Sequence, residues 1–191
     1  WASKTQQAIS LNKFDIVITN PPFGKEIRVV GEDTLAQYDL ACVWSRAGDD
    51  FVKTNKMRTE MPPQVLFIER CLQFLKDGGK LGIVLPETFF HAPNYKYILQ
   101  FIKRHNILWL VDLPHNTFRP HNNAKTVAVI IQKNTPQQDF INMAVAEEMG
   151  HDHNGGPIYR WDFSAKRIDK NKIWDDVSEI IKELDSPTKK Y

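Results

Sequence analysis

Apolar, β-branched residues gather in short runs along the chain, and polar or turn-forming residues follow each run. The first run, FDIVIT (14–19), has the length and composition of a strand buried on both faces, as in a parallel sheet. Comparable runs predict strands over residues 80–86, 107–114 and 125–133. The chain therefore contains at least four candidate strands for one sheet.

Helical patterns separate these strands. Pro62 and Pro63 suit the first turn of a helix. Apolar residues at helical spacing follow them, namely Val65, Ile68, Leu72 and Leu75, with Phe67, Cys71 and Phe74 widening the buried face. The glycines of DGG (77–79) are expected to close this helix. A second helix is predicted over 93–105, and the alternation of strands and helices indicates an α/β sheet.

Two regions depart from this alternation. Residues 24–61 form a long polar stretch, which we interpret as an ordered excursion or a lid. Beyond Pro136 the pattern predicts a further strand in INMAVAEEMG, a turn and hairpin in HDHNGGPIYRWD, and a short amphipathic helix over 177–184. No candidate site is assigned to this last part.

Composition sets loose bounds. The formal charge is +2, from 25 Lys and Arg against 23 Asp and Glu, which neither demands nor excludes a nucleic-acid partner. Cys42 and Cys71 lack the CxxC spacing of a zinc site, and no metal is expected. No apolar run reaches the ~20 residues of a membrane span. No basic-then-apolar leader opens the chain, so we expect a soluble, cytoplasmic protein without membrane contact.

The end of the first run carries unusual chemistry. Asn20, Pro21, Pro22 and Phe23 follow a predicted parallel strand, and ligands bind open α/β sheets at the carboxyl ends of such strands. The prolines stiffen the turn and remove two backbone donors, which leaves the Asn20 side-chain oxygen and the Pro21 carbonyl as acceptors. Phe23 offers a flat face for stacking. Acceptors beside an aromatic ring suit a planar ligand with an amino group, such as adenine.

The stretch VITNPPF resembles the (N/D)PP(Y/F) motif of amino-methyltransferases. In order along the chain, further segments resemble N6-adenine DNA methyltransferases, and in particular the modification subunits of type I restriction-modification systems. These segments are QYDLACVW, PPQVLFIERCLQFLKDGGKLGIVLPETFF, VDLPHNTFRPHNNAKTVAVIIQK and MAVAEEMGHDHNGGPIY, and the likeness covers roughly residues 14–160. It implies a Rossmann-like, S-adenosylmethionine-dependent methyltransferase fold, with a mostly parallel sheet and flanking helices.

The resemblance also implies roles for single residues. Asn20 and the Pro21 carbonyl would accept hydrogen bonds from the adenine amino group, with Asn20 also at the cofactor, and Phe23 would stack on a base flipped out of the duplex. Phe118 is the best match for the aromatic that closes the other face of the base, although His121 lies nearer the last strand. Lys125 and Thr126 match the family's KT pair, with a structural or a phosphate-contacting role.

One feature of the family is missing. These enzymes bind the cofactor on a glycine-rich loop between a strand and a helix, whereas Gly78, Gly79 and Gly82 lead from a helix into a strand. We therefore predict the later half of a catalytic domain over 1–135 and a C-terminal extension over 136–191. We expect this chain to be inactive by itself, with DNA and specificity and restriction subunits as partners. A truncated, non-enzymatic module that binds DNA or subunits is the alternative, as is an RNA or protein-glutamine methyltransferase.

Simpler explanations stay open for several residues. The Asn-Pro-Pro turn could only stop a strand, with Phe23 in the core, and Phe118 could be packing. HDH (151–153) is expected to be a solvated loop because no third metal ligand follows at a useful spacing. Asp112 and Glu87, at strand ends, are interpreted as solvent-facing caps rather than as groups that support the site residues, and Arg70 as an exposed helix position.

Overall fold

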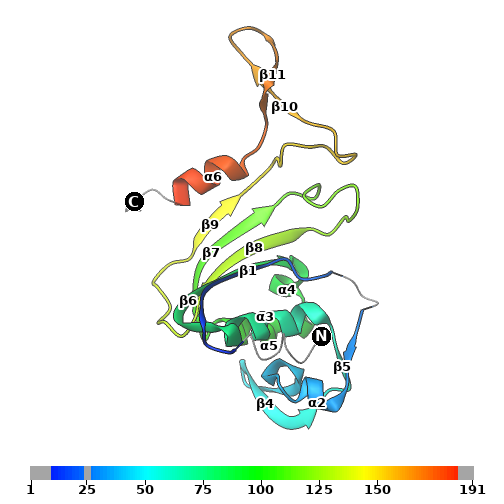
Figure 1. The fold of residues 1–191 in the computed structure, drawn as a ribbon, viewed down its shortest axis with the longest axis vertical. Coiled ribbons are helices and arrows are strands. Elements are labelled where there is room, and N and C mark those ends of the chain that lie inside the picture. The colour runs from blue at the N-terminus through cyan, green and yellow to red at the C-terminus, as the bar shows by residue number, and fades with distance from the viewer. Residues whose placement is uncertain (1–9, 24–26, 185–191) are drawn as a thin grey trace. The chain divides into compact units, whose positions relative to one another are not determined.

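The computed structural model describes residues 10–23 and 27–184. A five-stranded sheet has the order β1-β6-β8-β7-β9 (Figure 1). Its strands are β1 (Phe14–Thr19), β6 (Leu75–Pro86), β8 (Thr126–Gln132), β7 (Asn106–Leu113) and β9 (Asn142–Val145). The four strands predicted from apolar runs, and the fifth in INMAVAEEMG, are confirmed.

The sheet is mixed. Strands β1 and β6 pair in parallel, with Thr19 opposite Ile83. At the start of β6, Gly78 donates its N–H to the Lys133 carbonyl and Lys133 donates to the Gly79 carbonyl, both at 2.8 Å. Lys133 directly follows β8, so β8 runs opposite to β6. The α/β class is confirmed, with the crossover from β1 to β6 as its parallel element.

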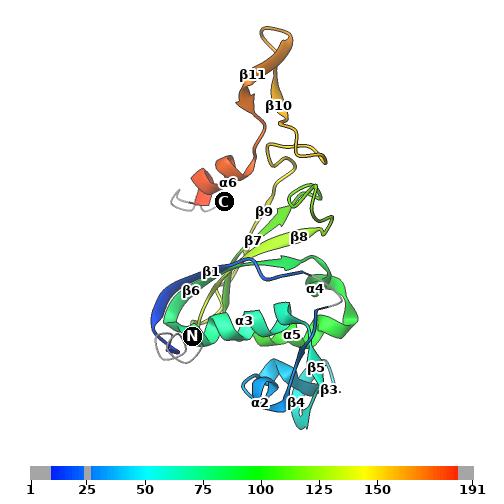
Figure 2. The same cartoon turned by 45° about the vertical axis from the view of Figure 1, so that its right-hand side comes forward.

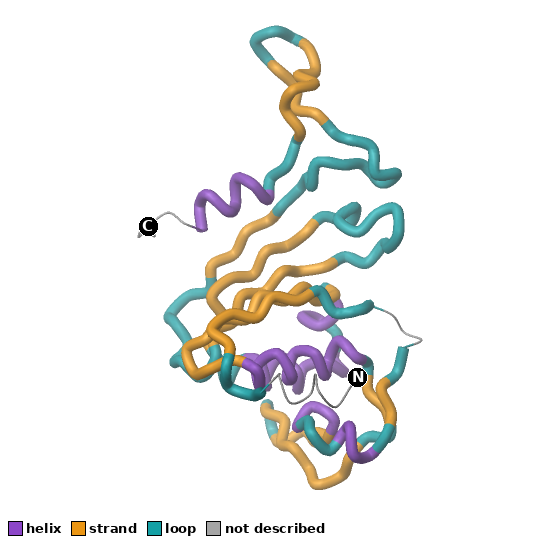
Figure 3. The backbone as a smooth tube through the Cα atoms, viewed as in Figure 1, coloured by secondary structure: helices purple, strands orange, loops and turns teal. Residues whose placement is uncertain are grey.

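The remaining elements are short except for α3, as Figure 3 shows by colour. The helices are α2 (Glu32–Leu35), α3 (Pro63–Phe74), α4 (Thr88–His91), α5 (Lys96–Ile102) and α6 (Val177–Leu184), with 3-10 turns η1 (Asp39–Ala41) and η2 (Pro93–Tyr95). Three two-stranded pairs are β2 (Val29–Val30) with β5 (Glu60–Met61), β3 (Cys42–Ala47) with β4 (Asp50–Met57), and β10 (Tyr159–Asp162) with β11 (Arg167–Ile173). No helix within the described ranges is long and apolar enough to cross a membrane.

The chain divides into two compact units. The first unit contains residues 1–110 and 128–142, and the second contains residues 111–127 and 143–191. The domain boundary predicted between residues 135 and 136 stays a prediction.

Strand β1 is not buried on both faces, so that prediction is wrong. Ile16 is 64% exposed and Ile18 is 82% exposed. Helices α3 and α5 lie on the same side of the β1–β6 pair (Figures 1 and 2). Because β1 is an edge strand and both helices cover one face, the described residues leave its opposite face open.

Helix α3 ends earlier than predicted. Its last residue is Phe74, and Leu75 already has the extended backbone of β6. The carbonyls of Gln73 and Phe74 accept the backbone N–H groups of Asn12 and Lys13, both at 2.9 Å. Since residues ahead of β1 satisfy the end of the helix, the expected glycine cap at 77–79 is wrong. Phe67, predicted to be core, is 38% exposed on this helix.

The polar excursion is ordered over 27–61 and is held by side chains of α3 and α5. The Glu69 carboxylate accepts the backbone N–H groups of Asp39 and Leu40, each at 2.8 Å. Gln100 bonds both the N–H and the carbonyl of Phe51. Burial raises the pKa of Glu69, and the N–H groups of η1 partly oppose that rise.

Arg70 also holds the excursion against α3. Its guanidinium donates to the Tyr38 hydroxyl at 3.1 Å and to the Gln37 side chain at 2.6 Å, and it stacks over the Tyr38 ring. The interpretation of Arg70 as a plain exposed position is therefore wrong. Its partners come from the excursion, more than 30 residues away in sequence.

Candidate active site

The motif Asn20–Phe23 begins where β1 ends. Thr19 is the last paired residue of β1 and lies opposite Ile83, in the carboxyl half of β6. Pro21 is buried, while Asn20 and Pro22 are exposed. Since neither proline has an N–H group to donate, the ladder stops here. The predicted position at the carboxyl end of a parallel strand is observed.

The Asn20 amide is available to a ligand. Its side chain is exposed and makes no hydrogen bond within the described ranges 10–23 and 27–184. Phe23 is half-buried. The turn thus exposes the Asn20 amide to solvent, while the buried Pro21 packs against the protein. The roles assigned to these residues stay predictions.

The end of β6 contributes to the same edge of the sheet. Glu87 follows β6 at the N-cap of α4 and is exposed, as a solvent-facing cap should be. The buried Phe89 ring stacks on Tyr95, with centroids 4.5 Å apart and planes at 13°. Sequence reasoning missed this stack, although TFF before PNY is a local aromatic signal. The stack of Phe89 on Tyr95 holds in place the short segment that follows β6.

The second unit holds the other predicted aromatic. Phe118 lies half-buried in the turn between β7 and β8, and its carbonyl accepts the Asn122 N–H at 2.8 Å. Thr117 closes the same turn by donating its hydroxyl to the Pro114 carbonyl at 2.6 Å. His121 is exposed. Phe118 is therefore carried by a hydrogen-bonded turn.

Lys125 immediately precedes β8, and Thr126 is its first residue. The Lys125 ammonium forms an ion pair with Asp112 at 2.8 Å and donates to the Leu113 carbonyl at 2.7 Å. Asp112 is thus a partner of Lys125, and its interpretation as a solvent-facing cap is wrong. Thr126 is fully buried, and its hydroxyl has no hydrogen-bond partner among the described residues. The structure favours the structural role for Lys125.

The HDH segment forms a turn. The Asp152 carboxylate accepts the N–H groups of Gly156 and Asn154, both at 2.8 Å, and these bonds hold its pKa below the ordinary value. His151 bonds the Asp152 carbonyl through its ring nitrogen. Within the described part of the chain, no three His, Cys, Asp or Glu side chains gather as metal ligands.

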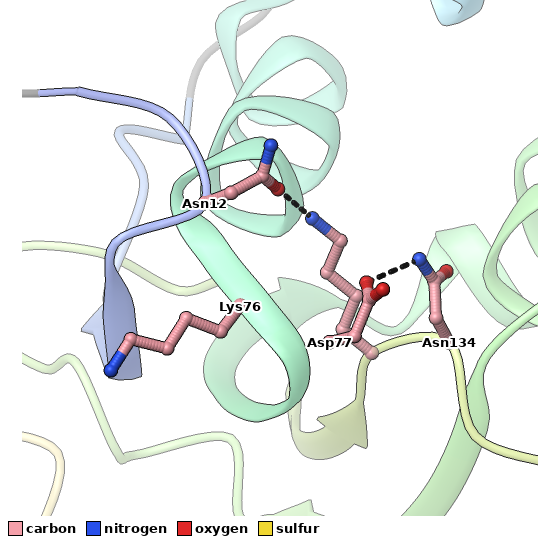
Figure 4. Close-up of a pocket in the computed structure, with 5 residues that line it drawn as sticks. Asn12, Lys76, Asp77 and Asn134 are labelled. Atoms are coloured by element: carbon pink, nitrogen blue, oxygen red, sulfur yellow. Dashed lines mark hydrogen bonds between the residues drawn. The ribbon is translucent and has the colours of Figure 1, made fainter.

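A polar cavity of about 400 Å³ lies at the start of β6, the end away from Asn20 (Figure 4). Its lining residues are Asn12, Lys76, Asp77, Lys133 and Asn134. Lys133 donates to the Asn12 side chain at 2.6 Å and to the Leu75 carbonyl at 2.7 Å. Asn134 donates to Asp77 at 2.7 Å. Lys76 instead pairs with Asp15 of β1 at 2.9 Å. The contacts of Lys133 and Lys76 therefore join β6 to β1 and to the residues before it.

Solved structures identify the class of fold. A class I S-adenosylmethionine-dependent methyltransferase from Listeria monocytogenes matches with a TM-score of 0.50 and 18% identity, over 71% of this chain and 37% of that one. The type I restriction-modification methyltransferase subunit from Streptococcus thermophilus matches with a TM-score of 0.54 and 20% identity, over 94% of this chain and 32% of that one. The fold is that of the class I methyltransferases.

Sequence comparison identifies the family. The type II methyltransferase M.VspI from Vibrio sp. (strain 343) is 24% identical over 136 residues, which are 70% of this chain and 28% of that protein. This chain thus spans less than a third of that relative. The model of the Eco57I restriction-modification methylases matches residues 1–118. The chain belongs to the Eco57I restriction-modification methylase family, and the resemblance to restriction-modification methyltransferases is confirmed.

Proposed function

We propose that this chain carries the adenine-positioning part of a DNA methyltransferase that acts on the N6 amino group. The observation that carries the proposal is the unengaged Asn20 amide at the carboxyl end of β1, set on a turn anchored by the buried Pro21. An exposed amide next to a stiff, donor-poor turn is available to a substrate amine. The family match supports DNA as the substrate.

The residues would act by positioning. The Asn20 side-chain oxygen and the Pro21 carbonyl accept the two hydrogens of the adenine amine, which orients its nitrogen lone pair away from the turn. Phe23 stacks on the base, and the family resemblance assigns the second face of the base to Phe118. Because an adenine in a duplex is stacked and paired, it must first be flipped out. No covalent bond to the protein is needed, since orientation and electrostatics do the work.

The acceptors at this edge also fit the cofactor. S-adenosylmethionine supplies an electrophilic methyl group on a positively charged sulfur when it is bound. The groups at the end of β1 are neutral amide and carbonyl oxygens, which carry partial negative charge and favour a nearby cation. Asn20 would therefore contact the cofactor as well as the base.

We further propose partners and a location for the protein. A modification subunit of a type I system would work with specificity and restriction subunits, and the Streptococcus thermophilus neighbour is such a methyltransferase subunit. DNA as substrate places the protein in the cytoplasm. We include both assignments in the proposal.

Methyl transfer by the complete protein tests the proposal. Labelled S-adenosylmethionine is offered with duplex DNA, RNA or protein as acceptor, and we expect label on DNA adenine. Asn20→Ala should abolish transfer, with a larger effect on kcat than on KM, because the lost bonds orient the amine in the transition state. Asn55→Ala, at an exposed asparagine of β4, is the matched control. Near-normal kcat in Asn20→Ala would reduce the motif to a structural turn.

A further inference from the structure

The hairpin β10–β11 concentrates positive charge. Its span 159–173 holds five basic residues and two acidic ones, which leaves a net charge of +3. The whole chain carries only +2 in 191 residues. The basic residues are Arg160, Lys166, Arg167, Lys170 and Lys172. A short ribbon therefore carries more net charge than the entire protein.

Most of these charges are unneutralised. Arg160 pairs with Glu179 at 2.7 Å. The carboxylate of Asp162 accepts the N–H groups of residues 164 and 165, and Asp169 accepts the N–H of Asn171. Both acids of the hairpin are thus engaged by its own backbone. The other four basic side chains form no ion pair within residues 10–23 and 27–184.

The hairpin also exposes apolar surface. Phe163, at its turn, is 84% exposed, and Trp161 and its cross-strand partner Ile168 are each about half exposed. The two strands pair only with each other among the described residues (Figure 3). An isolated two-stranded hairpin is marginally stable in water. Basic residues interleaved with exposed aromatics indicate a surface that a polyanion covers.

We propose that the hairpin β10–β11 is a DNA-binding element whose lysines contact backbone phosphates. A two-stranded ribbon fits the major groove of a duplex, and each neutralised phosphate releases condensed counterions. Lys166, Lys170 and Lys172 supply the contacts, and Phe163 leads the turn toward the duplex. This inference rests on DNA being the substrate in the proposed function.

Fluorescence anisotropy with a short labelled duplex tests the hairpin in the full 191-residue chain. The variant Lys166→Ala/Lys170→Ala/Lys172→Ala should weaken Kd by about 10- to 100-fold at low salt. The slope of log Kd against log salt should fall by about 2–3. A matched variant, Lys13→Ala/Lys80→Ala/Lys103→Ala, removes the same charge from exposed positions of the first unit and should leave both values nearly unchanged.

A triple Lys→Arg variant at positions 166, 170 and 172 separates charge from folding. It should bind as tightly as the parent, because phosphate contacts need the charge rather than the lysine shape. Loss of binding in the Arg variant, equal losses in the two Ala variants, or no duplex binding by the parent would each overturn the proposal. So would an unchanged DNA affinity in the triple Lys→Ala variant. The two proposals can fail separately. If methyl transfer requires Asn20 but DNA affinity does not depend on the three lysines, this inference is wrong and the proposed function stands.

Discussion

Glu69 accepts the backbone N–H of Leu40 through one carboxylate oxygen at 2.8 Å, across 29 positions of sequence. Both residues are buried, with Leu40 fully enclosed. A carboxylate on the apolar face of a helix is costly unless its oxygens are bonded. Here the cost is offset because the start of η1 supplies the donors. This contact joins the excursion to α3.

Replacing Glu69 should loosen that junction. In Glu69→Gln one oxygen becomes an NH₂ group that faces a backbone donor, so a buried N–H loses its acceptor. We expect the free energy of unfolding to fall by about 1–3 kcal/mol. Urea denaturation of the full chain measures it. Glu147→Gln, at an exposed position, is the control and should change little. Equal stability of the two variants would contradict the anchoring role.

Phe23 should tolerate other aromatic rings. Phe23→Trp and Phe23→Tyr keep a π-face and should retain methyl transfer in the complete protein. Phe23→Ala should cost the ~1–3 kcal/mol of a lost base stack, read as reduced kcat/KM. If Phe23 also drives extrusion, the cost should shrink on a mismatched adenine, which flips more easily. Full activity in Phe23→Ala would rule out stacking.

Phe118→Ala should separate base contact from packing. If Phe118 covers the base, its removal should lower methyl transfer by less than Phe23→Ala does and leave Tm nearly unchanged. A core phenylalanine would instead cost ~3–5 kcal/mol of stability. Thermal melts run beside methylation rates decide between these outcomes. His121→Ala tests the alternative residue in the same turn, because a larger loss of methyl transfer than in Phe118→Ala would assign the second face to His121.

His105 should make stability pH-dependent. Its ring is buried, and Nδ1 accepts the Asn134 N–H at 3.2 Å. Burial, and then the Lys133 charge, hold its pKa below the ordinary value of 6.5. The folded state therefore disfavours protonation. Its contribution to stability is present above that value and is lost as the pH falls through the folded pKa.

Urea unfolding at about pH 7.5 and about pH 5.5 measures the effect. The free energy of unfolding should be lower at the acidic pH, and His105→Gln should reduce the difference. The charged groups that act on His105 are Lys133, Arg104 and Asp77. His91→Gln, at an exposed histidine, should leave the difference intact. If the pH dependence of the free energy of unfolding is unchanged in His105→Gln, a group other than His105 causes it.

Local pattern was enough to place the candidate site. The run 14–19 is followed by Asn20 and two prolines, and prolines cannot donate the backbone hydrogen bonds that continue a strand, so Asn20 was expected at the strand end. The apolar stripe on 63–74 predicted its helix, and Glu69 within that stripe was an unused signal of a buried acceptor. The expectations of β9 and α6 succeeded for the same reason, since periodicity is a property of neighbours in sequence. The hairpin β10–β11 lies later than predicted, because only its first strand falls within HDHNGGPIYRWD.

Contacts between distant residues were decided only by the tertiary structure. The sequence by itself determined the strands of the main sheet, the helices α3 and α6, and the chemistry at the end of β1, because each depends on a few adjacent residues. It could not show that Arg70 meets Tyr38, that Lys125 meets Asp112, or that residues 12 and 13 end α3 at Phe74. Nor could it show Ile16 and Ile18 exposed, since an apolar strand has the same composition whether a second layer covers it or not. Which residues contact each other depends on which surfaces pack together, and packing is a property of the three-dimensional structure.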